Sequence, residues 1–592
     1  MPELIWEGKD AVINYHHSLP VRELKIDQHE SLSPEPSLDD NLIIEGDNIE
    51  VLKSLIPKFA SKVDVIYIDP PYNTGNENEN WVYNDNLNSP QIKSWLGKVV
   101  GKEDLQKHDK WLCMMYPRLV LARELLSESG VIFISINDVE FFHIKIMLDE
   151  IFDEDNYIET FTVRSNPRGN QAKKHTASEH EYILCFSKLK TNLLPFGFIK
   201  GIENYNKSDN QGKAYEERGL RKRGADSKRS DAPNQYFPIF YDAQNSEIST
   251  ERKSNNAIEI LPKLSNGEDG RWRWSKDTVN KEINKLIVRV VKNKSEKRFD
   301  VFEKIYFEEN KISKIRSILS EKSFNYENAT ENLKEIFEQP VFNYSKPVYL
   351  LKHLLNSLAD FDKDFLILDF FAGSGTTGHA VLEMNKEDGG NRKFILVQQP
   401  EESEEASKQG FKNIFEITTA RIRRCIEGVA TAKDPKLKEG LGGSFTVVKL
   451  GEALHLNTLF LEKDLPSYEA LASYLFYHTT NQALSNVTEN ASHYIGKTEN
   501  YKLYLIYSAD KEKLKHHDYA LSRSKLEQIL KDCDNGYQAL IYAVTIYVDN
   551  KSIKSLMEKE KYTKKPIICQ IPYQYLQINS ANVLNNLEDS ED

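Results

Sequence analysis

Four consecutive residues, Asp69-Pro70-Pro71-Tyr72, have the types and spacing to hold the amino group of a planar base. They follow the apolar run 63–68, whose length and β-branched side chains are typical of a buried parallel strand. The two prolines fix the backbone and remove two amide donors, which leaves the Asp69 carboxylate and the Pro70 carbonyl as acceptors. The Tyr72 ring offers a stacking face. We interpret this catalytic tetrapeptide as a site for a flipped nucleotide; the alternative is a Pro-Pro turn after a strand.

A second motif lies 300 residues further along the chain, in the run Asp369-Phe370-Phe371-Ala372-Gly373-Ser374-Gly375-Thr376-Thr377. It follows another apolar run and precedes a helix expected at about 378–384. The two glycines permit a tight turn with exposed amides, and the three hydroxyls could bond a carboxylate at the helix N-terminus. Such a glycine loop alone could serve NAD, a phosphate or plain packing. It lacks the lysine of a phosphate loop, which disfavours ATP.

The elements that must position both motifs form one pattern. Apolar runs at 41–44, 63–68, 131–136, 365–369 and 394–397 read as buried strands, and helical periodicity separates the first three of them. Alternating strands and helices predict an α/β protein with a doubly wound, mostly parallel sheet. Because both motifs follow strands of that sheet, we expect them at its carboxyl edge, where open α/β folds bind ligands.

Charge is distributed unevenly along the 592 residues, whose formal net charge is −12. Residues 161–300 contain 28 Lys and Arg against 18 Asp and Glu, a net of +10, so the remainder carries −22. In this segment Arg221-Lys222-Arg223 and Arg271-Trp272-Arg273-Trp274 combine cations with aromatic rings, as surfaces that hold a phosphate backbone do. The alternatives are a solvated face for the charges and a core position for Trp272 and Trp274.

Weak periodicity between the two α/β segments predicts an insertion, within which 281–304 reads as helical. We expect a lead-in with little structure of its own (1–40), a catalytic half (41–160), the insertion (161–340), a cofactor half (341–438) and a C-terminal α+β domain (439–592).

Composition excludes several classes of protein. Hydrophobic residues make up 40% and charged residues 28%, which argues against global disorder. The sequence contains no run of eighteen apolar residues and no basic-then-apolar start, so a soluble, cytoplasmic protein without a membrane partner is expected. Five widely spaced cysteines with no C-x-x-C pair and no clustered histidines predict reduced thiols and no metal site.

The two motifs together resemble those of S-adenosylmethionine-dependent DNA amino-methyltransferases. Their order, with the tetrapeptide first and the glycine loop after a basic insertion, resembles the permuted β class, whose insertion is the target recognition domain. More closely, segments 69–75, 134–138, 180–184, 271–275 and 394–398 look like those of the modification subunit of type III restriction-modification systems. The resemblance implies a Rossmann-like fold with circularly permuted motif order. It also implies methylation of adenine N6 in double-stranded DNA, a homodimer, and a separate restriction (helicase/nuclease) subunit.

The resemblance also implies roles for individual residues. Asp69 and the Pro70 carbonyl would bind the adenine amino group, with Tyr72 stacking on the base beside Pro71. The cofactor S-adenosylmethionine would contact Asp47 at its adenine and lie along a pocket partly walled by Lys346. Gln398 or Glu401 would bind its ribose, where many relatives have a carboxylate. The rest of the cofactor site would be formed by Asp369, Phe371, Ala372, Gly373, Ser374, Gly375 and Thr376.

Other functions remain open at this point. The chain could be an orphan DNA methyltransferase, adenine- or cytosine-N4-specific, that acts without a nuclease. It could be an RNA or protein amino-methyltransferase, or a silent module that only reads DNA sequence. Intact Asp69 and glycine loop disfavour the silent module, and Asp rather than Ser at position 69 favours adenine by resemblance.

Overall fold

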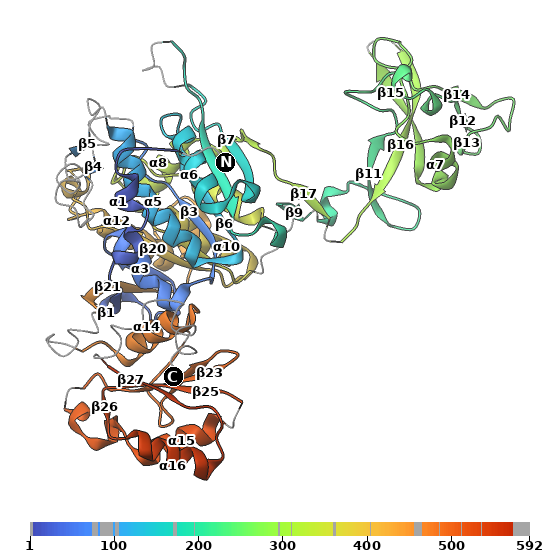
Figure 1. Ribbon diagram of the computed structural model, residues 1–592. Coiled ribbons are helices and arrows are strands. Elements are labelled where there is room, and N and C mark those ends of the chain that lie inside the picture. Colours follow the sequence, from blue (N-terminus) through green and yellow to red (C-terminus); the bar gives the residue numbers. More distant parts are fainter. Residues whose placement is uncertain are drawn as a thin grey trace. The chain divides into compact units, whose positions relative to one another are not determined.

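In the computed structural model the chain forms two compact units (Figure 1). The larger unit combines Met1–Pro195 with Arg316–Asp592, and the smaller unit is Phe196–Ile315. We describe each unit by itself. The residues described are 4–73, 81–82, 99–100, 106–169, 175–193, 196–199, 201–293, 296–309, 311–358, 363–402, 404–454, 465–484, 486–510, 512–533 and 536–571. Thr74 and Gly75, the end of the first segment that carries the family resemblance, lie outside them.

The larger unit contains a ten-stranded mixed sheet in the order β1-β21-β2-β20-β19-β3-β6-β8-β7-β18. Strands β21, β2, β20, β19, β3 and β6 run parallel, whereas β8 is antiparallel to both of its neighbours. The mixed α/β class predicted from the sequence is confirmed. The strands are β1 (Arg22–Leu32), β2 (Leu42–Glu45), β3 (Val63–Ile68), β6 (Leu126–Ile136), β7 (Tyr157–Val163), β8 (Glu181–Ser187), β18 (Ile318–Leu319), β19 (Leu366–Asp369), β20 (Lys393–Gln398) and β21 (Phe445–Ala453).

Helices cover both faces of this sheet. On one face, α3 (Asn48–Phe59), α5 (Lys107–Leu125) and α6 (Phe141–Phe152) bury one apolar cluster with alternate residues of the strands. The helices α9 (Val348–Asn356), α10 (Thr376–Asp388) and α12 (Ile414–Glu427) pack together. Helix α10 contacts the strand side chains that point to the other face of the sheet. A Cβ atom on Gly378 would lie 2.9 Å from Leu396 and 2.8 Å from Ile422, so glycine permits this close packing.

The N-terminal segment, expected as a lead-in with little structure, instead supplies the edge strand β1. It pairs antiparallel with β21, which begins beyond the cofactor half, and so closes one side of the sheet. Its polar, half-exposed side chains hide the strand from a search for apolar runs, because an edge strand is fixed by backbone pairing as much as by burial.

The C-terminal part folds around a smaller sheet in the order β22-β23-β25-β27, where the last three strands are parallel. Helices in the crossovers make this region α/β, not the α+β arrangement predicted. The elements are α14 (Tyr468–Thr480), β22 (Tyr494–Lys497), β23 (Tyr501–Ile506), α15 (Arg523–Cys533), β25 (Gln538–Ala543), α16 (Asn550–Glu560) and β27 (Ile567–Gln570).

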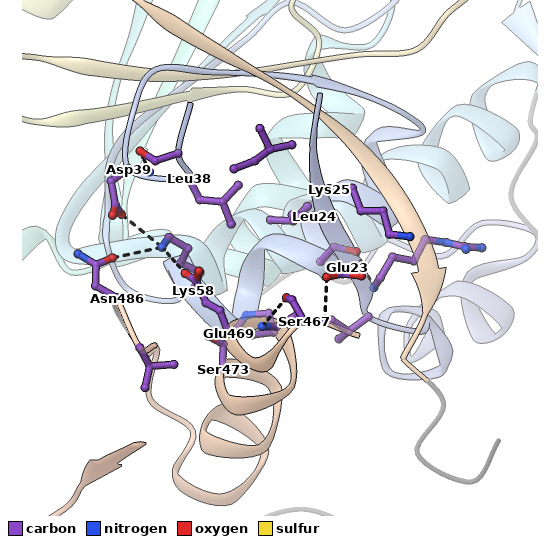
Figure 2. A pocket seen from close by; sticks show the side chains of 18 of the residues that line it. Glu23, Leu24, Lys25, Leu38, Asp39, Lys58, Ser467, Glu469, Ser473 and Asn486 are labelled. Atoms are coloured by element: carbon purple, nitrogen blue, oxygen red, sulfur yellow. Dashed lines mark hydrogen bonds and ion pairs between the residues drawn. The ribbon is translucent and has the colours of Figure 1, made fainter. Parts of the chain in front are cut away.

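A cavity of about 650 Å³ lies where β1, α3 and α14 meet, and it contains no residue of the two motifs (Figure 2). The buried Lys58 ammonium lies 3.3 Å from Asp39, 3.1 Å from Glu469 and 3.3 Å from the Asn486 side-chain oxygen. These contacts connect the C-terminal part to the large sheet. Within the described residues, no helix combines the length and the apolar character needed to cross a membrane.

The smaller unit is mostly β structure. A four-stranded antiparallel sheet in the order β10-β11-β16-β15 lies beside a three-stranded one, β13-β12-β14. The predicted helix at 281–304 is wrong, because most of it forms the hairpin of β15 and β16. Its elements are β10 (Lys207–Ser208), β11 (Ala214–Gly219), β12 (Ile239–Asp242), β13 (Glu247–Ser249), β14 (Ile258–Ile260), α7 (Lys276–Lys281), β15 (Leu286–Asn293) and β16 (Glu296–Tyr306), with β9 (Gly197–Ile199) and β17 (Ile312–Lys314) paired at its ends.

Candidate active site

The two motifs meet because β3 and β19 are neighbouring parallel strands. Val65 pairs with Ile367 and Ile66 with Leu368, so both strands end at one edge of the sheet. The catalytic tetrapeptide leaves the end of β3 and the glycine loop leaves the end of β19. Segments 300 residues apart in sequence thus form one site, at the edge where the sequence predicted them.

Hydrogen bonds with α5 and with the N-cap of α6 hold the tetrapeptide and the residue that follows it. The Trp111 indole donates to the Pro71 carbonyl at 2.7 Å. Asn73, buried and at φ +56°, donates to the Lys107 carbonyl at 3.1 Å and to Glu140 at 2.5 Å. Among the described residues the Pro70 carbonyl accepts no hydrogen bond, so its oxygen is available for the amino group.

Lys346 contacts the Asp69 carboxylate directly. Its Nζ lies 2.7 Å from one Asp69 oxygen and 2.6 Å from the other, and its side chain is only 7% exposed. The ammonium also lies 4.9 Å from the centre of the Tyr72 ring and 5.0 Å from that of Tyr326. The resemblance implies that Lys346 walls part of the cofactor pocket, and the structure places its ammonium beside the Asp69 carboxylate.

Glu181, at the start of β8, fixes the other side of this cluster. Its Oε2 accepts hydrogen bonds from the hydroxyls of Tyr72 at 2.9 Å and Tyr326 at 2.5 Å. Desolvation raises the pKa of the Glu181 carboxyl, and Lys346, 3.8 Å away, opposes that rise. Sequence reasoning missed Glu181 and Tyr326. The available signal was an acidic residue opening an otherwise apolar strand, in one of the segments that carried the resemblance.

The glycine loop has the backbone that its sequence requires. Gly373 and Gly375 have φ of +54° and +80°, and Gly375 is the N-cap of α10. Asp369 is buried under the loop, where it accepts hydrogen bonds from the Phe371 amide at 3.1 Å and the Thr377 hydroxyl at 2.5 Å. Desolvation raises the pKa of Asp369 to about 7. Asp369 therefore shapes the loop from below.

A buried guanidinium and three hydroxyls line the start of α10. Arg421 of α12 lies 3.0 Å from the Ser374 hydroxyl, 2.8 Å from that of Thr376 and 3.4 Å from that of Ser345. Burial lowers the pKa of Arg421 to about 10. Within the described part of the chain no carboxylate lies at ion-pair distance from Arg421. Sequence reasoning missed this residue, because an arginine within a helix gives no signal of such a position.

The donor set suits the methionine half of S-adenosylmethionine. Hydroxyls, a helix N-terminus and a buried guanidinium favour a carboxylate, which this cofactor carries. The neighbouring loop residues Phe371 and Ala372 are half-buried and buried, and Ala372 donates its amide to the Val397 carbonyl at 3.2 Å. The residues present therefore fit the cofactor that the resemblance implies.

The residues expected at the cofactor's other half come from the next strands. Strands β2 and β20 are parallel neighbours, so Asp47 and Gln398 follow adjacent strand ends. Asp47 caps α3 and lies 3.2 Å from Arg118. The Gln398 side-chain oxygen accepts the Gly373 amide at 2.8 Å, which couples it to the glycine loop, whereas Glu401 is exposed.

Comparison with known proteins identifies the family of the chain. A family model described as DNA methylase, of the N6/N4 methyltransferase type, matches residues 63–409. The chain is 33% identical to the type III restriction-modification enzyme EcoPI Mod subunit of Escherichia phage P1, over 74% of this chain and 70% of that protein. It is 34% identical to the type II methyltransferase M.KpnI of Klebsiella pneumoniae, over 70% of this chain and 94% of the relative.

A further relative is the EcoP15I Mod subunit of Escherichia coli, 30% identical over 71% of this chain and 68% of the relative. Among solved structures, PvuII DNA methyltransferase (cytosine-N4-specific) aligns at 12% identity and a TM-score of 0.30, over 66% of this chain and 95% of that one. The M1.HpyAVI–SAM complex aligns at 13% identity and a TM-score of 0.26, over 64% and 99%. On the family match and the sequence relatives, this chain belongs to the N6/N4 DNA methylase family and is an S-adenosylmethionine-dependent DNA methyltransferase.

Proposed function

We propose that the chain methylates the N6 amino group of adenine in duplex DNA, as the modification and recognition subunit of a type III restriction-modification system. The observation that carries the chemistry is the Asp69 carboxylate beside the free Pro70 carbonyl, next to the glycine loop. An exocyclic amine is a poor nucleophile because its lone pair is delocalised into the ring. Two fixed acceptors favour the tetrahedral nitrogen that attacks.

The remaining residues of the site position the base and the carboxylate. Glu181 holds the Tyr72 hydroxyl and so orients the ring on which a flipped base stacks. Lys346 holds both oxygens of Asp69 and faces the same ring. S-adenosylmethionine supplies an activated methyl group, so the task of the chain is alignment, an effect worth up to roughly 7–11 kcal/mol.

The same proposal assigns each part of the cofactor to particular residues. Arg421, Ser374 and Thr376 bind the methionine carboxylate, and Asp47 binds the cofactor adenine. Because Gln398 is engaged with the Gly373 amide, we assign the ribose hydroxyls to Glu401, which follows the end of the same strand by three residues.

The test of substrate identity is methyl transfer to matched duplexes that carry adenine or cytosine at the target position. We expect N6-methyladenine, because Asp rather than Ser occupies position 69. The resemblance to modification subunits implies a non-palindromic site that is methylated on one strand. Mass spectrometry of the digested duplex identifies the product. Formation of N4-methylcytosine would overturn the adenine assignment, and transfer to RNA or peptide alone would overturn the DNA assignment.

The subunit assignment rests on relatives named as Mod subunits, and the M.KpnI relative is named as a type II methyltransferase. We propose that the chain is a homodimer that also binds a restriction subunit. Light scattering of the same preparation measures the assembly. A monomer fully active on DNA would contradict the dimer.

The smaller unit, 196–315, is our candidate for sequence reading. Trp272 is fully buried and donates to the Phe237 carbonyl, so it anchors the core of this unit and does not stack on bases. Arg221 is half-buried beside it. Lys222 and Arg223 form no ion pair within the described residues, whereas Arg229 is paired with Asp269. Lys222 and Arg223 are therefore the residues of the basic run that we expect to contact phosphates.

Replacing both Lys222 and Arg223 by glutamine should weaken DNA binding and lower the slope of log affinity against log salt by up to about two units, because each phosphate that a cation no longer neutralises removes close to one unit. Fluorescence anisotropy with a labelled duplex at several salt concentrations measures the slope. The matched control replaces Lys551 and Lys554, two exposed cations on α16, and should leave it unchanged. Equal slopes in both double variants would mean that these cations form only a solvated face.

A further inference from the structure

A cluster of three potential metal ligands lies behind the catalytic tetrapeptide and has no role in the reaction described above. His108 is in the first turn of α5, Glu140 is the N-cap of α6, and His143 follows on α6. One ligand atom from each residue lies within 4.8 Å of those of the other two. His108 and His143 each place Nδ1 2.7 Å from a different oxygen of Glu140.

The burial of the carboxylate is unusual for a cluster of charged side chains near the surface. The Glu140 side chain is fully buried, whereas His108 and His143 are 38% and 35% exposed. A buried carboxylate needs compensating partners, and the N-terminus of α6 provides only a partial positive charge. The two imidazoles converge on it from the solvent side, and Asp109 adds a second negative charge near His143. The cluster therefore combines a buried carboxylate with two imidazoles that are partly open to solvent.

We propose that His108, Glu140 and His143 bind a divalent transition-metal ion of the zinc class. Two imidazole nitrogens and one carboxylate oxygen are a ligand set that Zn²⁺, Co²⁺ and Ni²⁺ accept, whereas Mg²⁺ and Ca²⁺ prefer oxygen ligands throughout. Metal–ligand distances of about 2.0–2.2 Å require the ligand atoms to separate only modestly from their present hydrogen-bonded spacing. Water completes the coordination on the exposed side of the histidines.

This ion would act on structure, not on the methyl group. Glu140 also accepts a hydrogen bond from Asn73, the residue that directly follows Tyr72. A metal at Glu140 would join the first turns of α5 and α6 and so fix Asn73. The sequence predicted no metal site, since it has no C-x-x-C pair and no clustered histidines. His108 lies 32 residues before Glu140, so only the fold brings the three ligands together.

The experiment measures metal binding without DNA or cofactor, so its outcome is independent of the proposed methyltransferase specificity. Tag-free protein is stripped with a chelator and titrated with Zn²⁺ by calorimetry and with Co²⁺ by visible absorption. We expect one ion per chain, unaffected by excess Mg²⁺, and a melting temperature that rises with Zn²⁺.

The matched variants are His108→Ala, His143→Ala and Glu140→Gln, each expected to weaken Zn²⁺ binding at least tenfold and to remove its effect on melting. His517→Ala, which removes an exposed histidine far along the chain, is the control and should bind normally. Circular dichroism verifies that each variant is folded. If an alanine variant fails to fold, the binding test is made with His143→Asn, which keeps a side chain of similar size and also removes the ligand. Absence of binding to the wild type, or binding that survives all three substitutions, would overturn the proposal and leave the cluster as hydrogen bonds alone.

Discussion

Asp69→Ala should lower the rate of methyl transfer by at least about a thousandfold while changing the affinity for S-adenosylmethionine less than threefold. Loss of one preorganised electrostatic interaction with reacting atoms costs about 10²–10³ in rate. Here the same change also leaves the buried Lys346 ammonium without its carboxylate, 2.6 Å away in the wild type. The cofactor donors that we propose, Arg421, Ser374 and Thr376, lie on α12 and at the start of α10, and none of them contacts Asp69 in the described part of the chain.

Single-turnover methyl transfer and calorimetry with the cofactor measure the two quantities separately. Asp69→Asn keeps the shape and one acceptor oxygen, but it removes the charge that faces Lys346, so it should also be strongly impaired. Asp155→Ala removes an exposed carboxylate near β7 and should behave as wild type. Parallel loss of cofactor affinity and rate in Asp69→Ala would mean that Asp69 belongs to the cofactor site instead.

The second large effect is expected for Gly373→Val, which should abolish measurable cofactor binding and therefore activity. Gly373 has φ +54°, a region that costs L-residues roughly 1–2 kcal/mol and β-branched residues more. The new side chain would point toward Phe342, 3.5 Å from the Cβ position, and stand where the cofactor must approach the backbone. Movement of the loop would also break the Gly373 amide's hydrogen bond to Gln398.

A matched control separates backbone strain from the cofactor effect. Gly389 has φ +68°, ends the same helix α10, and has nothing within 4 Å of a Cβ position. Gly389→Val should destabilise the protein to a similar degree yet bind the cofactor normally. Retained cofactor affinity in Gly373→Val, measured by calorimetry on folded protein, would refute the assignment of this loop.

Errors of the sequence interpretation arose where local pattern and tertiary context disagree. The segment between 281 and 304 read as helical, but the β-branched residues Ile287, Val288, Val290 and Val291 form β15, which is stable as part of a hairpin. The sequence left Trp272 open between base stacking and core, and its zero exposure assigns it to the core. Neither the hairpin nor the buried position of Trp272 can be predicted without knowing which residues pack against these segments.

The sequence by itself determined the local geometry of the site. Each motif directly follows its own strand: Asp69-Pro70-Pro71-Tyr72 follows one, and the loop with Gly373 and Gly375 follows another. This local arrangement depends only on residues that are close along the chain, and parallel strands place their carboxyl ends at one edge of the sheet. Only the tertiary structure decided that Lys346 and Glu181 flank Asp69 and that Arg421 lies under the glycine loop. Those contacts depend on strand order and helix packing, which reflect the summed burial of the whole sheet and not the spacing of any one motif.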